Sequence, residues 1–204
     1  MNKIIPHIYQ VKVELEDIEP LIWRRLQIPA DLFLHDFHKV LQTTMGWENQ
    51  HLHLFRKGKK LFGMADDEWN GNPLFQDYTI VRVNDLLRKP GDEMVYEYDF
   101  GDDWRHRIIL EMEMEPDPLE YYPVCIDGAR ECPPEDCGGP GGYQEMVAAV
   151  KDPSNPQHRF FKALFPDGLD PEYFDLEEIN DILLEDDYGC LLPFDDYDED
   201  EDED

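Results

Sequence analysis

The feature that most constrains this chain is the stretch YEYDFGDDWRH, residues 96–106, in which aromatic and charged residues alternate on both sides of Gly-Asp-Asp. Such alternation around a turn sequence is typical of a β-hairpin. A three-residue loop, 101–103, would put the aromatic side chains on one face of the sheet and the charged ones on the other. This register predicts five facing pairs: Phe100 with Trp104, Tyr98 with His106, Tyr96 with Ile108, Asp99 with Arg105, and Glu97 with Arg107. The hairpin therefore places His106 on an apolar face.

Two further strands are predicted near the start of the chain. Over residues 9–15, apolar side chains occupy every second position, which is typical of a strand with one buried face. Over residues 20–29, Arg24 shares a face with the apolar Ile22 and Leu26. We therefore expect Arg24 to be half-buried. Its charge would extend to solvent, pair with a carboxylate, or contact the anion of a ligand.

A helix is predicted directly after the second strand. Asp31 can cap its N-terminus, and Gly46 can end it. Its apolar side is a stripe of residues at three- and four-residue spacing: Leu34, Phe37, His38, Leu41 and Met45. We expect this helix to cover the sheet, with His38 as a hydrogen-bonded core residue rather than a ligand.

The C-terminal third of the chain has helical periodicity. Helices are expected from Tyr143, after Pro156 and after Asp175, whose carboxylate can cap a helix N-terminus. The segments 65–77 and 115–142 are rich in turn-forming residues and are predicted to be irregular. Strands first and helices later indicate an α+β fold, with a largely antiparallel sheet covered by the inserted helix and a helical C-terminal third.

The chain is strongly acidic. Its formal net charge is −30, and nine of the last ten residues are acidic, which leaves −21 on the rest. We expect a single α+β domain over residues 1–190 and a disordered acidic tail over 191–204. An acidic surface repels phosphate backbones, so direct nucleic-acid binding is disfavoured. The basic cluster within 56–60 is expected to be the solvated tip of a hairpin.

The N-terminal residues show no apolar run. We therefore expect neither a signal peptide nor a membrane span, and we expect a cytoplasmic protein. Four cysteines in a chain of this length are more typical of reduced thiols or metal ligands than of a secreted disulfide framework.

Histidines and cysteines form two groups of candidate metal ligands. His51 and His53 lie two residues apart on a predicted strand, share a face, and could chelate one divalent ion. Cys125, Cys132 and Cys137 lie on a loop rich in glycine and proline, where thiolates could converge on zinc, with a histidine or the fourth cysteine completing the site. Alternatively, this loop folds by its own turns, and its thiols pack as small apolar groups. The candidate cofactor is zinc or another divalent metal.

Four motifs follow one another along the chain: PLIWRRLQIP, HKVLQTTMGWENQHLHLF, YEYDFGDDWRH and CPPEDCGGPGGY. In these motifs and their order, residues 8–187 resemble the plasmid pRiA4b ORF-3-like family, whose members include insertion-sequence passenger proteins with a TnpR-like label. The resemblance implies a compact α+β fold and an association with mobile elements, but no established reaction and no set of catalytic residues. The recombination that this label suggests would need a basic DNA-binding surface, and the composition of this chain argues against one.

Two functions of different classes fit these observations. The first is an accessory module that binds a protein partner through its acidic surface and through exposed aromatic residues, Trp47 and Trp69. The second is a metal-dependent hydrolase-like enzyme in which His51 and His53 hold the ion. For this second function the candidate polar cluster is Asp102, Asp103 and His106, with Asp99 as a further carboxylate.

Overall fold

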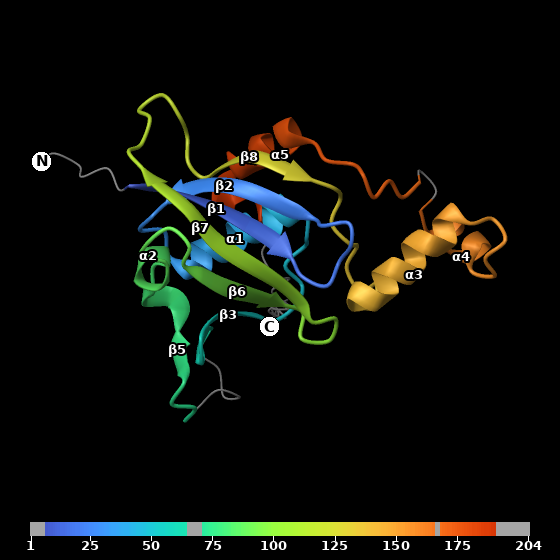
Figure 1. The fold of residues 1–204 in the computed structure, drawn as a ribbon, viewed down its shortest axis with the longest axis horizontal. Helices are drawn as coiled ribbons and strands as arrows, with labels where there is room; N and C mark the ends of the chain where they lie inside the picture. Colours follow the sequence, from blue (N-terminus) through green and yellow to red (C-terminus); the bar gives the residue numbers. More distant parts are fainter. Residues whose placement is uncertain (1–6, 65–70, 166–167, 191–204) are drawn as a thin grey trace, which may run out of the picture.

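The computed structural model describes residues 7–64, 71–165 and 168–190. In this part of the chain, eight strands form one sheet in the order β5-β4-β3-β6-β7-β1-β2-β8 (Figure 1). The strands are β1 (Ile8–Leu15), β2 (Trp23–Pro29), β3 (His53–Lys57), β4 (Lys60–Gly63), β5 (Phe75–Asp77), β6 (Glu93–Tyr98), β7 (Trp104–Met114) and β8 (Val124–Ala129). Neighbouring strands are antiparallel except β4 and β5. The predicted α+β fold with a largely antiparallel sheet is confirmed.

The two faces of the sheet differ in polarity because strand side chains alternate in direction. Along β1, every second residue from Tyr9 to Leu15 is buried, as predicted. On the opposite face, charged side chains pair between strands. Arg25 donates to Glu111 at 2.8 and 3.1 Å. Arg24 lies on the buried face as predicted, but it is almost completely enclosed, with only 3% of its surface exposed.

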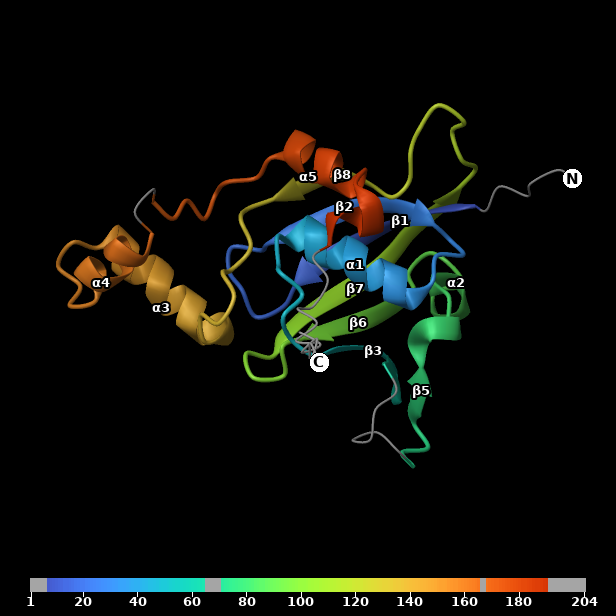
Figure 2. The same ribbon diagram turned by 180° about the vertical axis from the view of Figure 1, so that it is seen from behind.

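The helix α1 (Leu34–Met45) lies across the apolar face of the sheet (Figure 2). Its predicted apolar stripe is buried, and it ends at Gly46, whose φ of +80° favours glycine. The predicted Asp31 cap is wrong. The N–H of Leu34 donates to the backbone oxygen of Val81 at 2.9 Å. This backbone contact supplies an acceptor for the helix N-terminus that a capping side chain would otherwise provide.

The strands β6 and β7 form the predicted hairpin in a different register. Tyr98 faces Trp104, and Tyr96 faces His106, so the loop comprises residues 99–103. The five facing pairs predicted from a three-residue loop are therefore wrong. The observed pairing is shifted by two residues from the predicted one. Because side chains alternate with a period of two, every side chain still lies on the predicted face. His106 is accordingly buried on the apolar face, as predicted.

Asp99 explains why the hairpin turns early. Its backbone is in the left-handed region, with φ +54°, and its Oδ1 accepts the N–H groups of Gly101 at 2.9 Å and Asp102 at 3.3 Å. An aspartate that binds the backbone ahead of it in this way starts a turn rather than continuing a strand. Phe100 consequently lies in the loop, where 43% of its surface is exposed.

The prediction of an irregular segment over residues 115–142 is wrong in part. This segment contains β8, which pairs with β2 at the edge of the sheet, and the first turn of a helix that begins at Gly139. Gly128 is needed for packing on β8. A Cβ atom there would lie 2.6 Å from the ring of Phe174. A glycine that indicates a loop in the sequence therefore allows close contact with an aromatic ring in the structure.

The remaining helical elements follow the expected order. They are η1 (Tyr78–Ile80), α2 (Val83–Leu86), α3 (Gly139–Lys151), α4 (His158–Leu164), α5 (Leu176–Leu183) and η2 (Asp186–Gly189). The predicted cap at Asp175 is confirmed, because its Oδ1 accepts the N–H groups of Glu177 and Glu178, each at 3.0 Å. The helix α5 lies beside β8 and α1.

The helices α3 and α4 pack against each other and stand away from the sheet (Figures 1 and 2). Apolar side chains of α4 are therefore exposed. Phe160 has 65% of its surface exposed and Leu164 has 55%.

The structure describes two of the predicted loop segments, at least in part, but not the predicted tail. The end of the segment 65–77 forms the short strand β5 instead of an irregular loop, while residues 65–70 lie outside the described part. The basic cluster within 56–60 does form a hairpin tip, where Lys57 faces Lys60. The acidic tail over 191–204 lies outside the described residues.

Three histidines lie between α1 and the sheet. The rings of His38 and His53 stack with centroids 3.5 Å apart, and His106 is completely buried. Burial lowers the pKa of His38 to about 2, with a further contribution from His53. Burial also lowers the pKa of His53 to about 4 and that of His106 to about 3, so all three rings are neutral at pH 7.

The hydroxyl of Tyr96 anchors His38 in this core. The Nε2–H of His38 donates to Asn49 at 2.9 Å, and its Nδ1 therefore accepts from the Tyr96 hydroxyl at 2.8 Å. The same hydroxyl accepts from the side chain of Gln42 at 2.9 Å. The prediction that His38 is a hydrogen-bonded core residue is confirmed.

We predict that the folded protein loses stability between pH 7 and pH 5.5. These histidines bind protons in the unfolded chain near pH 6.5 but not in the folded one, so the unfolded state gains protons first. The expected loss is about 1.3 kcal/mol for each histidine and about 4 kcal/mol in sum. Urea denaturation at the two pH values measures it.

His106→Leu should remove about a third of this pH-dependent loss, because it removes one of the three histidines that bind a proton only in the unfolded chain. An equal free energy of unfolding at both pH values would contradict the prediction.

Candidate metal site

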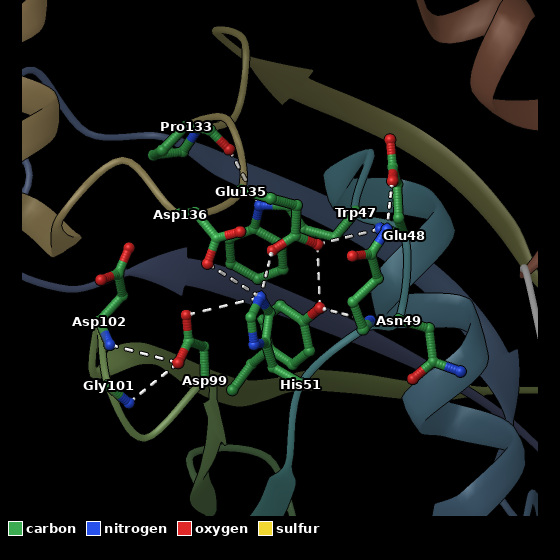
Figure 3. A network of polar contacts seen from close by, with 12 residues as sticks. Trp47, Glu48, Asn49, His51, Asp99, Gly101, Asp102, Pro133, Glu135 and Asp136 are labelled. Carbon is green, nitrogen blue, oxygen red and sulfur yellow. Dashed lines mark hydrogen bonds and ion pairs between the residues drawn. The ribbon is translucent and has the colours of Figure 1, made fainter. Parts of the chain in front are cut away.

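A histidine and several carboxylates meet at one end of the sheet (Figure 3). They come from three segments: residues 47–51 between α1 and β3, the β6–β7 loop over 99–103, and residues 130–138 between β8 and α3. The third segment is tied to the first by the indole of Trp47, whose Nε1–H donates to the backbone oxygen of Pro133 at 2.9 Å.

The side chain of His51 is the centre of this cluster. Its Nε2 lies 3.4 Å from Oδ1 of Asp136, 3.6 Å from Oε2 of Glu135 and 3.8 Å from Oδ2 of Asp99. Three carboxylate oxygens thus surround one imidazole nitrogen. The ring of His51 lies edge-on to Tyr98, with centroids 5.8 Å apart, and this contact limits its orientation.

The carboxylates of Asp99 and Glu135 are oriented by the backbone and by a phenol. One oxygen of Asp99 accepts N–H groups of its own loop, so the other faces His51. Glu135 Oε1 accepts from the Tyr98 hydroxyl at 2.9 Å and from the N–H of Glu48 at 3.0 Å. The site is therefore largely formed before any ligand binds, because these bonds leave Oε2 of Glu135 directed toward His51.

Two atoms of the cluster are buried without a hydrogen-bond partner among the described residues: Nε2 of His51 and Oε2 of Glu135. Leaving a buried polar atom unpaired costs about 1–3 kcal/mol. Asp99 is also buried, with 7% of its surface exposed, whereas 75% of the Asp136 side chain is exposed. The cluster is thus closed on the side of the sheet and open to solvent beside Asp136.

This donor set suits a divalent cation. In a tetrahedral site with metal–ligand distances of about 2.0 Å, neighbouring ligand atoms lie roughly 3.3 Å apart. The His51 distances of 3.4–3.8 Å are slightly wider than that separation and too long for strong hydrogen bonds. Ligand atoms of His51, Asp99 and Asp136 also all lie within 4.8 Å of one another. A central positive charge would relieve the mutual repulsion of the carboxylates.

The structure separates the residues that the sequence offered as metal ligands. His51 precedes β3 and enters the cluster, while the ring of His53 turns to the core, where its Nε2 bonds the hydroxyl of Tyr78 at 2.9 Å. Cys125, Cys132 and Cys137 are free thiols. In the described part of the chain, the group of converging donor atoms includes none of the cysteines.

Burial keeps these thiols protonated. It raises the pKa of Cys125 to about 11 and that of Cys132 and Cys137 to about 12, with further contributions from nearby carboxylates. A thiol must lose its proton to bind a metal, so these environments favour the alternative in which the cysteines pack as small apolar groups.

The other candidate polar residues are also divided among different places. His106 lies in the core, where its Nδ1–H donates to the backbone oxygen of Tyr96 at 3.2 Å. Asp103 pairs with Arg105 at 3.0 Å on the surface. Asp102 borders the cluster: its Oδ2 accepts the N–H of Gly138 at 3.0 Å and so joins two of the three segments.

Trp47 was expected to be exposed, and this expectation is wrong. Only 5% of its surface is accessible, because its indole stacks on Tyr98 with ring centroids 4.8 Å apart. Trp69 lies outside the described residues.

Sequence reasoning also missed Glu135 and Asp136. They are adjacent acidic residues directly after two prolines in CPPEDCGG. The prediction for this segment considered its cysteines as ligands and not its carboxylates.

The chain belongs to the plasmid pRiA4b ORF-3-like protein family, whose model matches residues 7–178. It is similar to the uncharacterized protein y4hQ of Sinorhizobium fredii (strain NBRC 101917 / NGR234). The two are 37% identical over 156 residues, which cover 76% of this chain and 79% of the relative.

A solved structure has the same fold. It is the crystal structure of a protein of unknown function, MM3350, from Methanosarcina mazei Go1, with a TM-score of 0.77 and 32% sequence identity. The match covers 84% of this chain and 97% of the other. Neither relative's name assigns a reaction, so these similarities establish the family and the fold. Among the residues described, none of the helices combines the length and apolar character needed to cross a bilayer.

We predict that Tyr98→Phe destabilises the protein by about 1–2 kcal/mol. The substitution removes the hydroxyl that donates to Glu135 and accepts from the N–H of Gln50 at 3.1 Å, and it leaves both groups without that partner. Chemical denaturation measures the change in the free energy of unfolding. Tyr121→Phe is the matched control and should change it by less than about 0.5 kcal/mol, because 77% of Tyr121 is exposed. Equal effects would show that the Tyr98 hydroxyl does not hold the site together.

Proposed function

We propose that this protein binds a divalent transition metal through His51, Asp99 and Asp136, with Glu135 as the third carboxylate and fourth ligand. The observation that carries the proposal is the set of three carboxylate oxygens 3.4–3.8 Å from one imidazole nitrogen that has no hydrogen-bond partner among the described residues. A mixed set of one nitrogen and several oxygen donors favours zinc or manganese.

The proposed site differs from the acidic residues elsewhere on the surface because it is partly buried. An acidic protein attracts cations everywhere, but weakly, because exposed carboxylates are screened by water and salt. Here Asp99 and one oxygen of Glu135 are withdrawn from water, and both are oriented by neighbouring donors. A preorganised and partly desolvated donor set binds a cation more tightly than a mobile one.

We predict that wild-type protein binds one Zn²⁺ or Mn²⁺ per chain and that His51→Ala weakens binding at least tenfold. Isothermal titration at pH 7.5, with the metal content of the dialysed protein measured in parallel, tests this. At a free metal concentration of 100 times Kd, the bound ion should stabilise the fold by about 2.7 kcal/mol, and His51→Ala should abolish that gain.

Two matched controls separate the site from general acidity. His7→Ala removes a histidine that also lies beside carboxylates, 2.9 Å from Glu113, but at the exposed surface. Asp103→Asn is the counterpart of Asp136→Asn, since both are exposed aspartates in turns. Only the changes at His51 and Asp136 should weaken binding. Equal binding by all variants, or several weak ions per chain, would refute the proposal.

Cys137→Ser tests the competing cysteine site. Because burial keeps the Cys137 thiol protonated, the substitution should leave metal binding unchanged. Loss of the ion in this variant, with binding retained in His51→Ala, would move the site to the cysteine loop.

A protein-interaction role is the second candidate, and the exposed apolar face of α4 favours it. Phe160 and Leu164 lie one helical turn apart on a helix pair that stands away from the sheet. Replacing both with Ser should preserve folding and reduce cross-linking to a partner. The same change at Leu119 and Tyr121, which are exposed elsewhere, should not. Unchanged cross-linking in the α4 variant would remove this candidate.

A further inference from the structure

A second candidate ligand site is a cavity beside the C-terminal end of α1. A cavity of about 390 Å³ opens there between α1, the segment 131–134, and α5 with the residues that precede it. Its volume is within the range of about 300–1,000 Å³ typical of small-molecule sites. None of the metal-cluster residues lines it, so the inference does not depend on the proposed metal.

Arg24 lies at this cavity and is the reason to consider a ligand. Its Nε–H donates to the backbone oxygen of Thr44 at 2.8 Å, and its Nη1 donates to those of Trp23 at 2.9 Å and Ala129 at 3.1 Å. The guanidinium also lies over the ring of Phe174, 4.8 Å from its centroid. The side chain is thus held in one orientation by neutral groups.

The guanidinium of Arg24 forms no ion pair with the described residues. The residue is 97% enclosed, yet no described carboxylate lies within ion-pair distance of it, and its Nη2 makes no hydrogen bond to the described residues. Buried cations are rarely left without an anion, because removing a charge from water is costly. Other arginines of the sheet are paired with carboxylates. Arg25, for example, contacts both Glu111 and Asp127.

We propose that this cavity binds a small monocarboxylate with an apolar body, whose carboxylate accepts from Nη2 of Arg24. The apolar part of the ligand would lie against Phe174 and Ile179, which line the cavity. A carboxylate on a guanidinium is a strong, charge-assisted hydrogen bond.

The acidic residues of the cavity restrict the ligand to a single negative charge. Glu131, Asp175 and Glu178 also line it. Asp175 is occupied by the N–H groups of α5, and Glu178 accepts the hydroxyl of Tyr173 at 3.0 Å. These carboxylates would repel a second charge on the ligand, so dicarboxylates and phosphate esters should bind poorly.

Isothermal titration with 4-methylpentanoate tests the proposal on the full-length protein. We expect one molecule per chain, and at least tenfold weaker binding of both 4-methylpentanamide, which lacks the charge, and the dicarboxylate adipate. Equal binding of acid and amide would overturn the proposal, and so would no binding of the acid.

Variants at the cavity mouth provide the control for folding. Arg24→Gln should abolish binding, but it also removes backbone contacts and can unfold the chain. Glu178→Trp places a large ring at the cavity from an exposed position, whereas Glu177→Trp is its neighbour outside the lining. Only Glu178→Trp should prevent binding, and equal binding by both would refute the site. Asp136→Asn should bind the acid normally, which separates failure here from failure of the metal site.

Discussion

The packing of Trp47 on Tyr98 is the interaction on which both proposed sites depend. Trp47 follows α1, Tyr98 ends β6, and the Trp47 indole holds Pro133 of the segment 130–138. This segment has little regular structure of its own, so its position depends on such contacts. Because Pro133 is fixed, Glu135 is brought to the Tyr98 hydroxyl and to His51. The aromatic face of the hairpin thus orders the segment that carries the chemistry.

The two proposed sites differ from the rest of the protein in how their charged side chains are paired. Elsewhere in the sheet, several arginines pair with carboxylates of other strands, as Arg56 does with Glu97 at 2.8 and 3.0 Å. At the proposed metal site, the carboxylates converge on His51, and none of them is paired with an arginine or lysine among the described residues. At Arg24, a buried positive charge is bound only by neutral groups. An enclosed charge without an ion-pair partner costs stability, and such groups are common at functional sites.

The sequence predicted the elements better than the contacts between them. Period-two and helical patterns identified β1, β2 and α1, because burial on one face leaves a direct pattern in the residues. The hairpin register failed because Asp99 bonds the backbone ahead of it, and this choice depends on loop geometry. For the site, the sequence offered His51 and Asp99, but Glu135 and Asp136 join them only through long-range packing. No local pattern encodes such packing.

The segment 131–136 joins the two proposed sites, because consecutive residues serve them in turn. Glu131 to Pro134 line the Arg24 cavity, and Glu135 and Asp136 face His51. Two successive prolines and the bond from Trp47 restrict this segment, so it cannot easily move toward one site without the other. A carboxylate at Arg24 and a cation at His51 would each supply the charge that its own site lacks. Both proposed sites therefore use the one conformation of this segment that the prolines and the Trp47 bond fix.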